Sequence, residues 1–435
     1  MAPSSHEINL AWRDPLSVFE PWASAANALL LHDGQQGRAR IFVQPDRVLN
    51  GQGRADFAAL AAEARQAGGV WAGLFGYDLA AAFERLPHLD PRWPPLALAR
   101  YPAWAEFDRE AGTIRVRGVT VHAVESLVAA INEVPDAHVI DTASTEPAMV
   151  RARDWSPRWD RDTYLGAARR ARDYVHAGDV FQVNLSQAFD VRLASSDTPW
   201  SVFTRLCEAS PAPHAAYLGL DDEHVVMTNS PERFLRVASG RVEARPIKGT
   251  RRRAGDPDED AGLAAELSAS AKDRAENLMI VDLMRNDLSR VCVPGSVSVP
   301  VLCEIESYAN VHHLVSVVEG NLADGQDVFD LLAASFPPGS VTGAPKVRAM
   351  EIISELEGEP RGAYCGALGW IDMDRGDMDL NVMIRTAALR RDDGKWRASL
   401  RSGGGIVADS EPVAEYEETL TKVSALRRAL GAGSA

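Results

Sequence analysis

The chain has 435 residues, of which 46% are hydrophobic and 25% charged, an ordinary globular composition with ample apolar material for a core. Its formal net charge of −15 at pH 7 argues against binding to nucleic acid or to an anionic membrane over a broad surface. No basic region followed by an apolar stretch opens the chain, and no apolar run approaches the roughly 20 residues of a membrane span. We therefore expect a soluble, cytoplasmic protein whose four cysteines, none in a C-x-x-C pair, are reduced.

The first third of the chain, residues 1–135, alternates short apolar runs with helical patterns. These patterns predict strands at 29–31, 41–43 and 68–78, the last punctuated by glycines, and a helix at 56–67. Residues 136–160 are rich in Ser, Thr, Pro, Ala and Asp and lack apolar periodicity, so they are predicted to form a linker.

The pattern is denser in the remaining region, residues 161–430. Helices are predicted at 162–176, 258–288, 347–356 and 411–430, and strands within 213–245 and 296–319. Residues 364–408 are predicted to form a three-stranded meander with turns at D-R-G-D and D-D-G-K. Strands joined by hairpins favour largely antiparallel sheets covered by helices over a parallel doubly wound sheet.

Two predicted helices carry acidic residues at matching spacing. Asp273 and Glu276 are three positions apart, as are Glu415 and Glu418, and Lys422 follows four positions later. Residues three apart share a helix face, so two such faces could together offer oxygen ligands to a hard divalent ion. Spacing alone is also explained by a solvated acidic face, which is the commoner arrangement.

Each of three further features is, taken alone, weak evidence for a functional site. Lys248, in R-P-I-K-G-T, would be a nucleophile if a partly apolar site lowered its pKa, but a surface lysine at a strand end fits equally. The glycines at 403–405 could hold a carboxylate through backbone N–H groups exposed in a turn. Arg385, on the preceding predicted strand, offers a guanidinium fork for a carboxylate or a cross-strand partner.

In their order these features resemble the chorismate-utilising enzymes, which include anthranilate synthase component I, aminodeoxychorismate synthase component I, isochorismate synthase and salicylate synthase. The resemblance covers nearly the whole chain and is strongest from about 160 to 425. The matching stretches are G-D-V-F-Q-V-N-L-S-Q (178–187), S-P-E-R-F (230–234), R-P-I-K-G-T-R (245–251), D-R-A-E-N-L-M-I-V-D-L-M-R-N-D-L (273–288), P-P-G-S-V-T-G-A-P-K-V-R-A-M (337–350), G-G-G-I-V-A-D-S (403–410) and E-Y-E-E-T (415–419). The resemblance implies an α+β fold of two packed, mostly antiparallel β-sheets flanked by helices, with residues 1–135 joined to the same body.

The resemblance also implies a Mg²⁺-dependent site. Glu276 and Glu418 match the family's Mg²⁺ ligands, with Asp273 and Glu415 in the adjoining shell, and the ion would bind the ring carboxylate of chorismate. Glu232 matches the general acid that protonates the leaving C4 hydroxyl. The positions that match substrate contacts are Gly249, Thr250, His313, Ser340, Tyr364, Arg385, Gly403, Gly404, Gly405 and Lys422.

Two positions separate the subfamilies. Isochorismate and salicylate synthases resemble one another in placing a water-activating lysine where this chain has Gln182, so an amine nucleophile fits better here. Anthranilate synthases usually read P-I-A-G-T, whereas Lys248 resembles the lysine of aminodeoxychorismate synthases, which attacks C2 of chorismate before ammonia adds at C4. The implied product is 4-amino-4-deoxychorismate, a precursor of 4-aminobenzoate and folate. The alternatives are anthranilate synthase component I and a non-catalytic chorismate-binding regulatory subunit.

Two expectations concern partners. None of the four cysteines lies in a G-x-C-x-G elbow and no lyase domain is expected after the last helix, so ammonia should come from a separate glutamine amidotransferase subunit. In relatives the N-terminal third holds a tryptophan site, and the matching stretch here is L-L-L-H-D-G, residues 29–34. Asp33 stands where relatives often have serine, which weighs against tryptophan binding.

Overall fold

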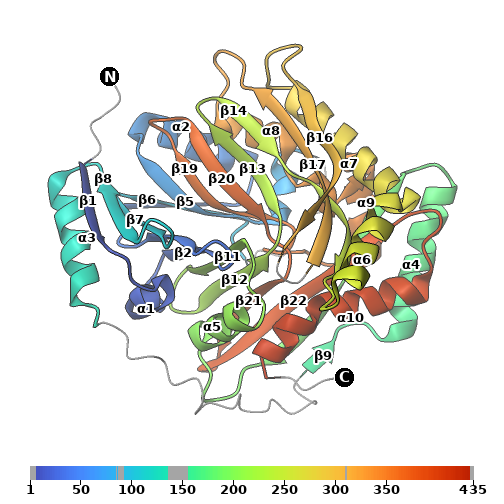
Figure 1. Ribbon diagram of the computed structural model, residues 1–435, viewed down its shortest axis with the longest axis horizontal. Helices are drawn as coiled ribbons and strands as arrows, with labels where there is room; N and C mark the ends of the chain where they lie inside the picture. Colours follow the sequence, from blue (N-terminus) through green and yellow to red (C-terminus); the bar gives the residue numbers. More distant parts are fainter. Residues whose placement is uncertain (1–5, 85, 87–92, 136–154, 309–310, 432–435) are drawn as a thin grey trace.

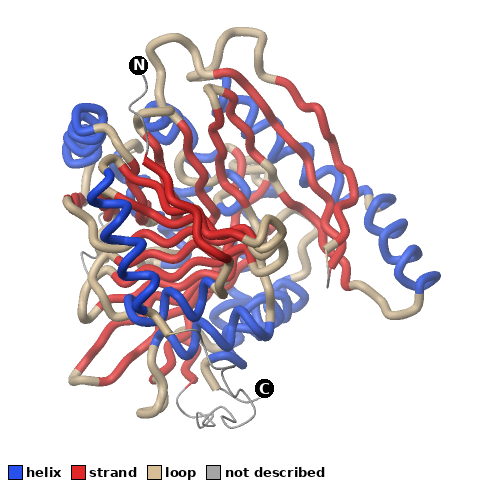
Figure 2. The backbone as a smooth tube through the Cα atoms, turned by 60° about the vertical axis from the view of Figure 1, so that its left-hand side comes forward, coloured by secondary structure: helices blue, strands red, loops and turns tan. Residues whose placement is uncertain are grey.

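The computed structural model describes residues 6–84, 86, 93–135, 155–308 and 311–431. Two large β-sheets fill the middle of the molecule, and helices lie on the outside (Figures 1 and 2). Every pairing between the named strands is antiparallel. The expected α+β fold of two packed antiparallel sheets is confirmed.

The first sheet has twelve strands drawn from both ends of the chain. In spatial order they are β1 (His6–Ala11), β8 (Thr113–Gly118), β7 (Ala103–Asp108), β3 (Arg38–Phe42), β2 (Ala28–Asp33), β11 (His214–Gly219), β12 (His224–Ser230), β21 (Thr386–Asp392), β22 (Lys395–Ile406), β10 (Gln182–Arg192) and β18 (Gly343–Ala344), with β9 (Trp155–Pro157) paired to β10.

The second sheet has ten strands and is mixed in the same way. Its order is β15 (Ile247–Arg252), β17 (Val311–Asn321), β14 (Arg241–Ala244), β13 (Arg233–Ala238), β20 (Asp377–Val382), β19 (Ala367–Asp372), β5 (Val70–Phe75), β6 (Leu96–Tyr101) and β4 (Arg47–Gly51), with β16 (Ser298–Ser307) paired to β17. Because β2 pairs with β11 and β5 with β19, the N-terminal strands are integral to both sheets.

The helices cover the outer faces of the sheets. They are α1 (Pro15–Phe19), α2 (Arg54–Ala67), α3 (Val121–Glu133), α4 (Arg161–His176), α5 (Pro199–Ala209), α6 (Pro257–Ala269), α7 (Ala271–Ser289), α8 (Val328–Ser335), α9 (Lys346–Glu357) and α10 (Pro412–Ala429), with short 3-10 turns η1 (Glu20–Trp22), η2 (Tyr77–Ala82) and η5 (Gly339–Val341). Helix α10 packs on β22 and α7 on β15 and β17, so the two acid-bearing helices belong to different sheets.

Alternating side chains explain how the sheets stack. On β2, Leu29 joins a core cluster that contains residues of both sheets, whereas Leu30 joins a cluster with residues of α1 and α5. On β5, Ala72 and Leu74 face the first of these clusters, and Trp71 faces the helices that cover the second sheet. Each strand therefore buries one face between the sheets and the other under helices, as the period of two requires.

Two sequence predictions need correction. The predicted meander at 364–408 is instead two hairpins, because β19 and β20 pair in the second sheet whereas β21 and β22 pair in the first. The chain crosses between the sheets after Val382, so Arg385 lies in this crossover, at a φ of 52°, and not on a strand. Most of the predicted linker lies outside the described residues, and its described end forms β9.

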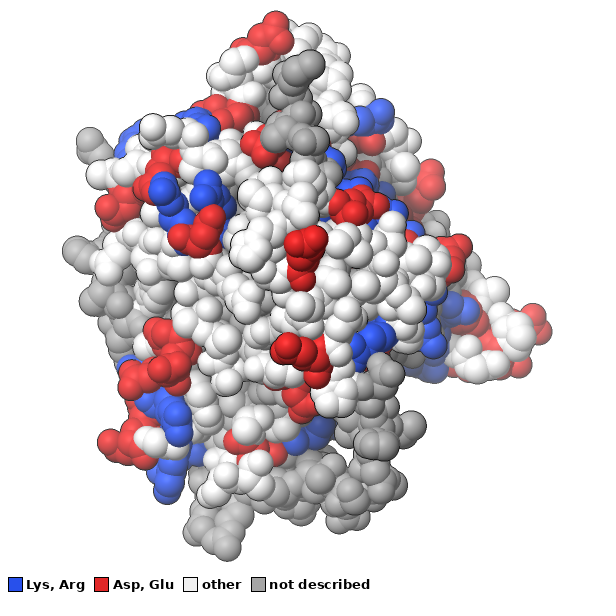
Figure 3. Space-filling view, turned by 90° about the vertical axis from the view of Figure 1, so that its left-hand side faces the viewer, with Lys and Arg blue, Asp and Glu red and all other residues white. Residues whose placement is uncertain are grey.

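The surface agrees with the acidic composition. On the face shown in Figure 3, acidic and basic side chains lie in mixed groups separated by uncharged surface, without a broad basic area. Among the described residues, no helix is both long enough and apolar enough to cross a membrane.

Candidate active site

Lys248 lies on β15, half-buried, with its side chain against the η5 turn. Its Nζ donates a hydrogen bond to the carbonyl oxygen of Ser340 at 3.0 Å. Burial lowers the pKa of the Lys248 amine, even though Glu276 and Glu232 favour the charged form. Gly249 follows at a φ of 80°, and a Cβ there would lie 2.9 Å from Asp273, so only glycine lets β15 approach α7 this closely.

Glu232 is buried beside this amine. Burial raises the pKa of the Glu232 carboxyl to about 7, while Ser340, Lys248 and Lys422 act in the opposite direction. Within the described part of the protein, neither Glu232 Oε1 nor Ser340 Oγ has a hydrogen-bond partner. A carboxyl that holds its proton near neutral pH, with a free oxygen, is suited to act as a general acid on a bound molecule.

The crossover brings a cation to the same site. Arg385 is largely buried and burial lowers the pKa of its guanidinium, yet no carboxylate of the described residues pairs with it. The positive charge of Arg385 also affects His313. The pKa of His313 is lowered to about 4, chiefly by burial and then by the charges of Arg385 and His312, so the imidazole is neutral. His313 Nδ1 and Thr250 Oγ1 share a hydrogen bond of 2.9 Å. An unpaired buried guanidinium is a ready receptor for a carboxylate.

The three glycines lie in strand β22, not in the predicted turn. Gly403 and Gly405 pair with Ser186 and Asn184 of β10. On the other side, β21 pairs with β22 only as far as Leu400, so the backbone of the glycines is open along that edge. Lys422 Nζ from α10 donates to the Gly403 carbonyl at 3.1 Å.

The predicted metal ligands, Glu276 on α7 and Glu418 on α10, are close enough for the charge of one to affect the pKa of the other. Burial raises the pKa of Glu276, Lys248 and Lys272 lower it, and Glu418 raises it. Lys422 pairs with Glu418 at 2.5 Å and Lys272 with Glu276 at 3.9 Å. These lysines thus partly neutralise the two carboxylates.

The adjoining acids are each held by a neighbour. Asp273 accepts from Arg251 at 3.3 Å, and Glu415 accepts from Ser410 Oγ at 2.7 Å. Gly404 allows α10 to lie close, since a Cβ there would be 3.0 Å from Glu415 and 3.3 Å from Glu418. The described residues contain no cluster of three or more His, Cys, Asp or Glu that could enclose a metal. Two facing carboxylates still suit Mg²⁺, which commonly takes one or two and draws its other ligands from water and substrate.

Tyr364, also predicted to contact the substrate, lies in a different part of the molecule's interior. Its side chain is buried, and the pKa of its hydroxyl is raised well above the usual range by burial. It lines a second cavity of about 290 Å³, together with Arg361, Thr386 and Arg401.

Sequence reasoning missed the state of Gln182. This side chain is fully buried, both its amide oxygen and its amide nitrogen lack partners among the described residues, and it packs against Gly405. A buried amide without partners costs free energy unless a ligand satisfies it. A lone glutamine in a strand pattern carries no signal of burial without partners, so sequence reasoning about Gln182 was limited to the comparison of subfamilies.

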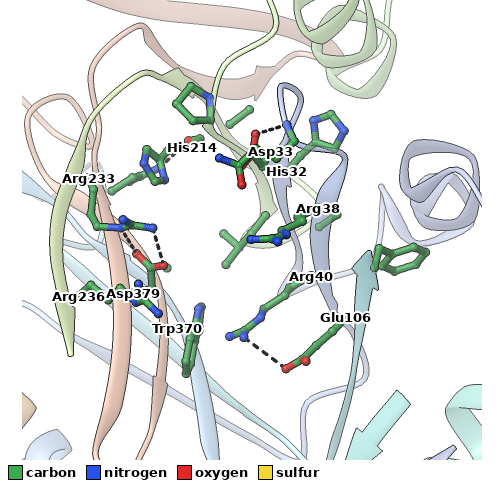
Figure 4. Close-up of a pocket in the computed structure, with 18 of the residues that line it drawn as sticks. His32, Asp33, Arg38, Arg40, Glu106, His214, Arg233, Arg236, Trp370 and Asp379 are labelled. Carbon is green, nitrogen blue, oxygen red and sulfur yellow. Dashed lines mark hydrogen bonds and ion pairs between the residues drawn. The ribbon is translucent and has the colours of Figure 1, made fainter. Parts of the chain in front are cut away.

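A cavity of about 630 Å³ lies elsewhere, between the N-terminal strands of the first sheet and the second sheet (Figure 4). We call it the Asp33 cavity, since Asp33 lines it with Arg38, Arg40, His214 and Trp370. The stretch predicted to match a tryptophan site, residues 29–34, thus borders this cavity, with Leu31, His32 and Asp33 in its lining. Whether tryptophan binds in this cavity stays a prediction from the sequence.

Comparison with known proteins agrees with this geometry. A model of the chorismate binding enzyme family matches residues 26–428. Aminodeoxychorismate synthase component 1 of Escherichia coli (strain K12) is 42% identical over 361 residues, which cover 82% of this chain and 76% of that protein. Anthranilate synthase component 1 of Aquifex aeolicus is 44% identical over 278 residues, covering 64% of this chain and 55% of that protein.

Solved structures share the fold. Anthranilate synthase component I from Streptococcus pneumoniae superposes with a TM-score of 0.77 at 28% identity, covering 89% of this chain and 92% of that one. The menaquinone-specific isochorismate synthase from Escherichia coli superposes with a TM-score of 0.75 at 18% identity, covering 99% of this chain and 95% of that one, and supports the fold alone. The resemblance drawn from the motifs is confirmed: the chain belongs to the family of chorismate binding enzymes.

Proposed function

We propose that this protein is the synthase component of an aminodeoxychorismate synthase, which aminates chorismate at C4. The observation that carries the proposal is Lys248, a half-buried amine with a lowered pKa that touches the Ser340 carbonyl and lies near Glu232. A lowered pKa increases the fraction of the amine that is uncharged, which is the nucleophilic form.

The residues divide the reaction into two displacements. In the first, the Lys248 amine bonds to C2 of chorismate, the ring double bonds shift, and the C4 hydroxyl takes the Glu232 proton and leaves as water. In the second, ammonia bonds to C4, the double bonds shift back, and the C2–N bond breaks so that its electron pair returns to Lys248. The proton that the ammonia sheds restores Glu232, and nitrogen replaces oxygen at C4. A covalent intermediate thus splits one difficult displacement into two easier steps.

The remaining residues bind and orient the substrate. The unpaired Arg385 guanidinium and the open edge of β22 would receive the carboxylates of chorismate. Glu276 and Glu418 would hold Mg²⁺, which when bound supplies positive charge to the ring carboxylate and eases departure of the C4 hydroxyl. Neutral His313 would lie beside the ring.

The nitrogen donor is proposed to be ammonia from a separate glutamine amidotransferase subunit. The relatives at 42% identity are described as component 1, which implies a second component. Gel filtration of this chain with a candidate amidotransferase should show a complex, and glutamine should support turnover only in the mixture.

The direct test is trapping of the covalent intermediate. After incubation with chorismate and Mg²⁺ but no ammonia, intact mass should increase by chorismate less water, and peptide mapping should place the adduct on Lys248. The Lys248→Ala variant should show no adduct and lose C4-aminated product by on the order of 1,000-fold or more. Adding ammonium to the wild type should then give 4-amino-4-deoxychorismate. Anthranilate as the product would instead support the anthranilate synthase alternative, and no turnover with ammonium would support the non-catalytic one.

A further inference from the structure

A buried ion-pair network lies behind the strands of the site. It consists of Glu357, at the end of α9, with Arg361 and Arg401, whose side chains are 0%, 1% and 5% exposed. The Glu357 carboxylate accepts from Arg361 Nη2 at 2.7 Å and from Arg401 Nη2 at 2.8 Å. Burying three charges is expensive even when they pair, and well-packed apolar residues often replace such groups without loss of stability. The network therefore calls for a role beyond stability.

The first role is visible at the η5 turn. Arg361 Nη1 donates to the carbonyl oxygen of Val341 at 3.0 Å. The carbonyl just before it, that of Ser340, accepts the hydrogen bond from Lys248 Nζ at 3.0 Å. Arg361 and the Lys248 amine thus bind consecutive carbonyls of one turn, so any shift of the guanidinium moves the group that orients the amine.

The same network holds the glycine strand. Arg361 Nη2 donates to the Asn184 carbonyl at 2.7 Å, and Arg401 Nε donates to Ser186 Oγ at 3.1 Å. Glu357 Oε1 accepts from both the backbone N–H and the hydroxyl of Ser186, each at 2.8 Å. Since Asn184 and Ser186 pair with Gly405 and Gly403, the network fixes the position of the open glycine edge.

A third contact reaches the segment that carries Tyr364. Asp78 accepts from the backbone N–H groups of Arg361 at 3.2 Å and Gly362 at 2.9 Å. The Arg361 guanidinium also lies 4.7 Å from the centre of the Tyr77 ring and 5.8 Å from that of Tyr364. Arg361 is thus the one residue of the network that touches the turn, the strand and the tyrosine.

We infer that Glu357, Arg361 and Arg401 are positioning residues that align the Lys248 amine with the glycine edge that receives chorismate. This inference rests on the proposed function, because it concerns the attack by Lys248. The network reaches one predicted substrate contact, Tyr364, and otherwise acts through the Ser340–Val341 turn and through Asn184 and Ser186. A misplacement of about 1 Å by a remote change can reduce turnover on the order of 100-fold, so small shifts of this turn matter.

The test compares two conservative variants. Arg361→Lys keeps a charge for Glu357 but cannot reach both the Val341 and Asn184 carbonyls. Arg205→Lys is the matched control, since Arg205 likewise binds a carboxylate, Asp197 at 3.0 Å, and a carbonyl, Ala429 at 3.1 Å, on the far end of α10.

We expect Arg361→Lys to lower kcat, and the rate of adduct formation on Lys248, by about 10- to 100-fold, with a smaller change in chorismate KM. Arg205→Lys should leave both within about twofold, although it also loses a carboxylate contact and some thermal stability. Unchanged kcat in a folded Arg361→Lys protein would overturn the inference.

A milder variant covers the case in which Arg361→Lys does not fold. Ser186→Ala removes one hydroxyl that bridges Glu357 and Arg401, and it should still lower the adduct rate several-fold; an unchanged rate would equally overturn the inference. Failure of this inference can be distinguished from failure of the proposed function. A wild-type protein that forms no adduct at all refutes the Lys248 chemistry, whereas equal adduct rates in the wild type and the variants refute only the positioning role.

Discussion

The site around Lys248 and the Asp33 cavity differ in how their buried charges are satisfied. In the Asp33 cavity, Arg233 pairs with Asp379 at 2.9 Å, and Arg40 pairs with Glu106 at 3.3 Å while it covers the Trp370 ring at 3.9 Å. Around Lys248, by contrast, the Arg385 guanidinium and one oxygen of Glu232 have no partner among the described residues.

Cavity volume is therefore a poor guide to chemistry in this fold. Arg40 and Arg233 on the walls of the open cavity of about 630 Å³ are ion-paired, and among the described residues His32 Nδ1 is the one buried side-chain atom of its lining without a partner, whereas the proposed catalytic site holds several such atoms, on Gln182, Glu232 and Ser340. Unsatisfied buried groups cost free energy in the empty protein, and a ligand that pairs with them recovers it.

Replacing Glu232, the proposed general acid, should have the largest effect. Glu232→Gln keeps the size of the side chain but removes the proton, so kcat should fall by about 100- to 10,000-fold. Chorismate should still bind, as measured by calorimetry, because the carboxylate receptors remain. The matched change in the other region, Asp33→Asn, should leave kcat within about twofold. Comparable losses in both variants would remove the distinction between the two regions.

Replacing the unpaired cation should weaken binding yet stabilise the protein. Arg385→Met removes a charge-assisted contact of about 1.5–3 kcal/mol, which corresponds to a rise in chorismate KM on the order of 10- to 100-fold. Thermal unfolding should occur at a higher temperature, since a buried charge without a partner is lost.

The paired arginine of the other region provides the control. Arg40→Met breaks the contacts with Glu106 and Trp370, so it should lower the unfolding temperature and leave KM unchanged. If Arg385→Met lowered the unfolding temperature as much as Arg40→Met does, the guanidinium of Arg385 would be stabilised in the folded protein, and the prediction that it is unpaired would be wrong.

The pH dependence of stability should also separate the regions. The pKa of Glu232 is raised from 4.5 to about 7 in the folded protein, so the native state binds this proton more tightly than the unfolded chain does. Stability contributed by that proton is complete below pH 4.5 and is lost as the pH rises through about 7. The loss is at most about 3 kcal/mol.

Urea unfolding of the wild type and of Glu232→Gln measures this effect. The variant should gain stability relative to the wild type between about pH 5 and pH 8, because glutamine does not ionise. Asp33→Asn should show a smaller change over the same interval, since Asp33 is less buried and its carboxylate accepts backbone hydrogen bonds from Gln35 and Gln36. Parallel stability curves for the wild type and Glu232→Gln would mean that the pKa of Glu232 is the same in the folded and unfolded protein.

Much of this fold could be predicted from local pattern. Apolar runs and turn residues located β2, α4 and α10 closely, because alternation and helical period are properties of short segments. The crossover after Val382 could not be predicted, since a hairpin and a jump between sheets begin with the same local signals. Arg385 was therefore assigned to a strand.

The predicted site depended on motifs rather than on periodicity. Lys248 and Glu232 were identified by resemblance, and the structure adds their burial and their shifted pKa values. The network of Glu357, Arg361 and Arg401 escaped detection because its members are up to 44 positions apart and read as ordinary charged residues. Only the fold brings them behind the η5 turn.

The smallest expected effect is that of tryptophan on the Asp33 cavity. Asp33 places a partly buried carboxylate in the stretch predicted from sequence to match a tryptophan site, and the carboxylate is held in place by the backbone N–H groups of Gln35 at 3.0 Å and Gln36 at 2.9 Å. The ring of Trp370 is already covered by Arg40, so an indole would have to displace a cation–π contact as well.

Tryptophan at about 1 mM should therefore leave both the unfolding temperature and the chorismate KM of the wild type unchanged. A ligand raises the unfolding temperature only when its concentration approaches or exceeds its dissociation constant. Asp33→Ser should sharpen the result: if the carboxylate is what excludes the ligand, this variant should gain a concentration-dependent rise in unfolding temperature. A rise in the wild type itself would show that the cavity binds tryptophan despite Asp33. The satisfied charges on its walls would then not be evidence against a ligand, and the contrast with the Lys248 site would rest on catalysis alone.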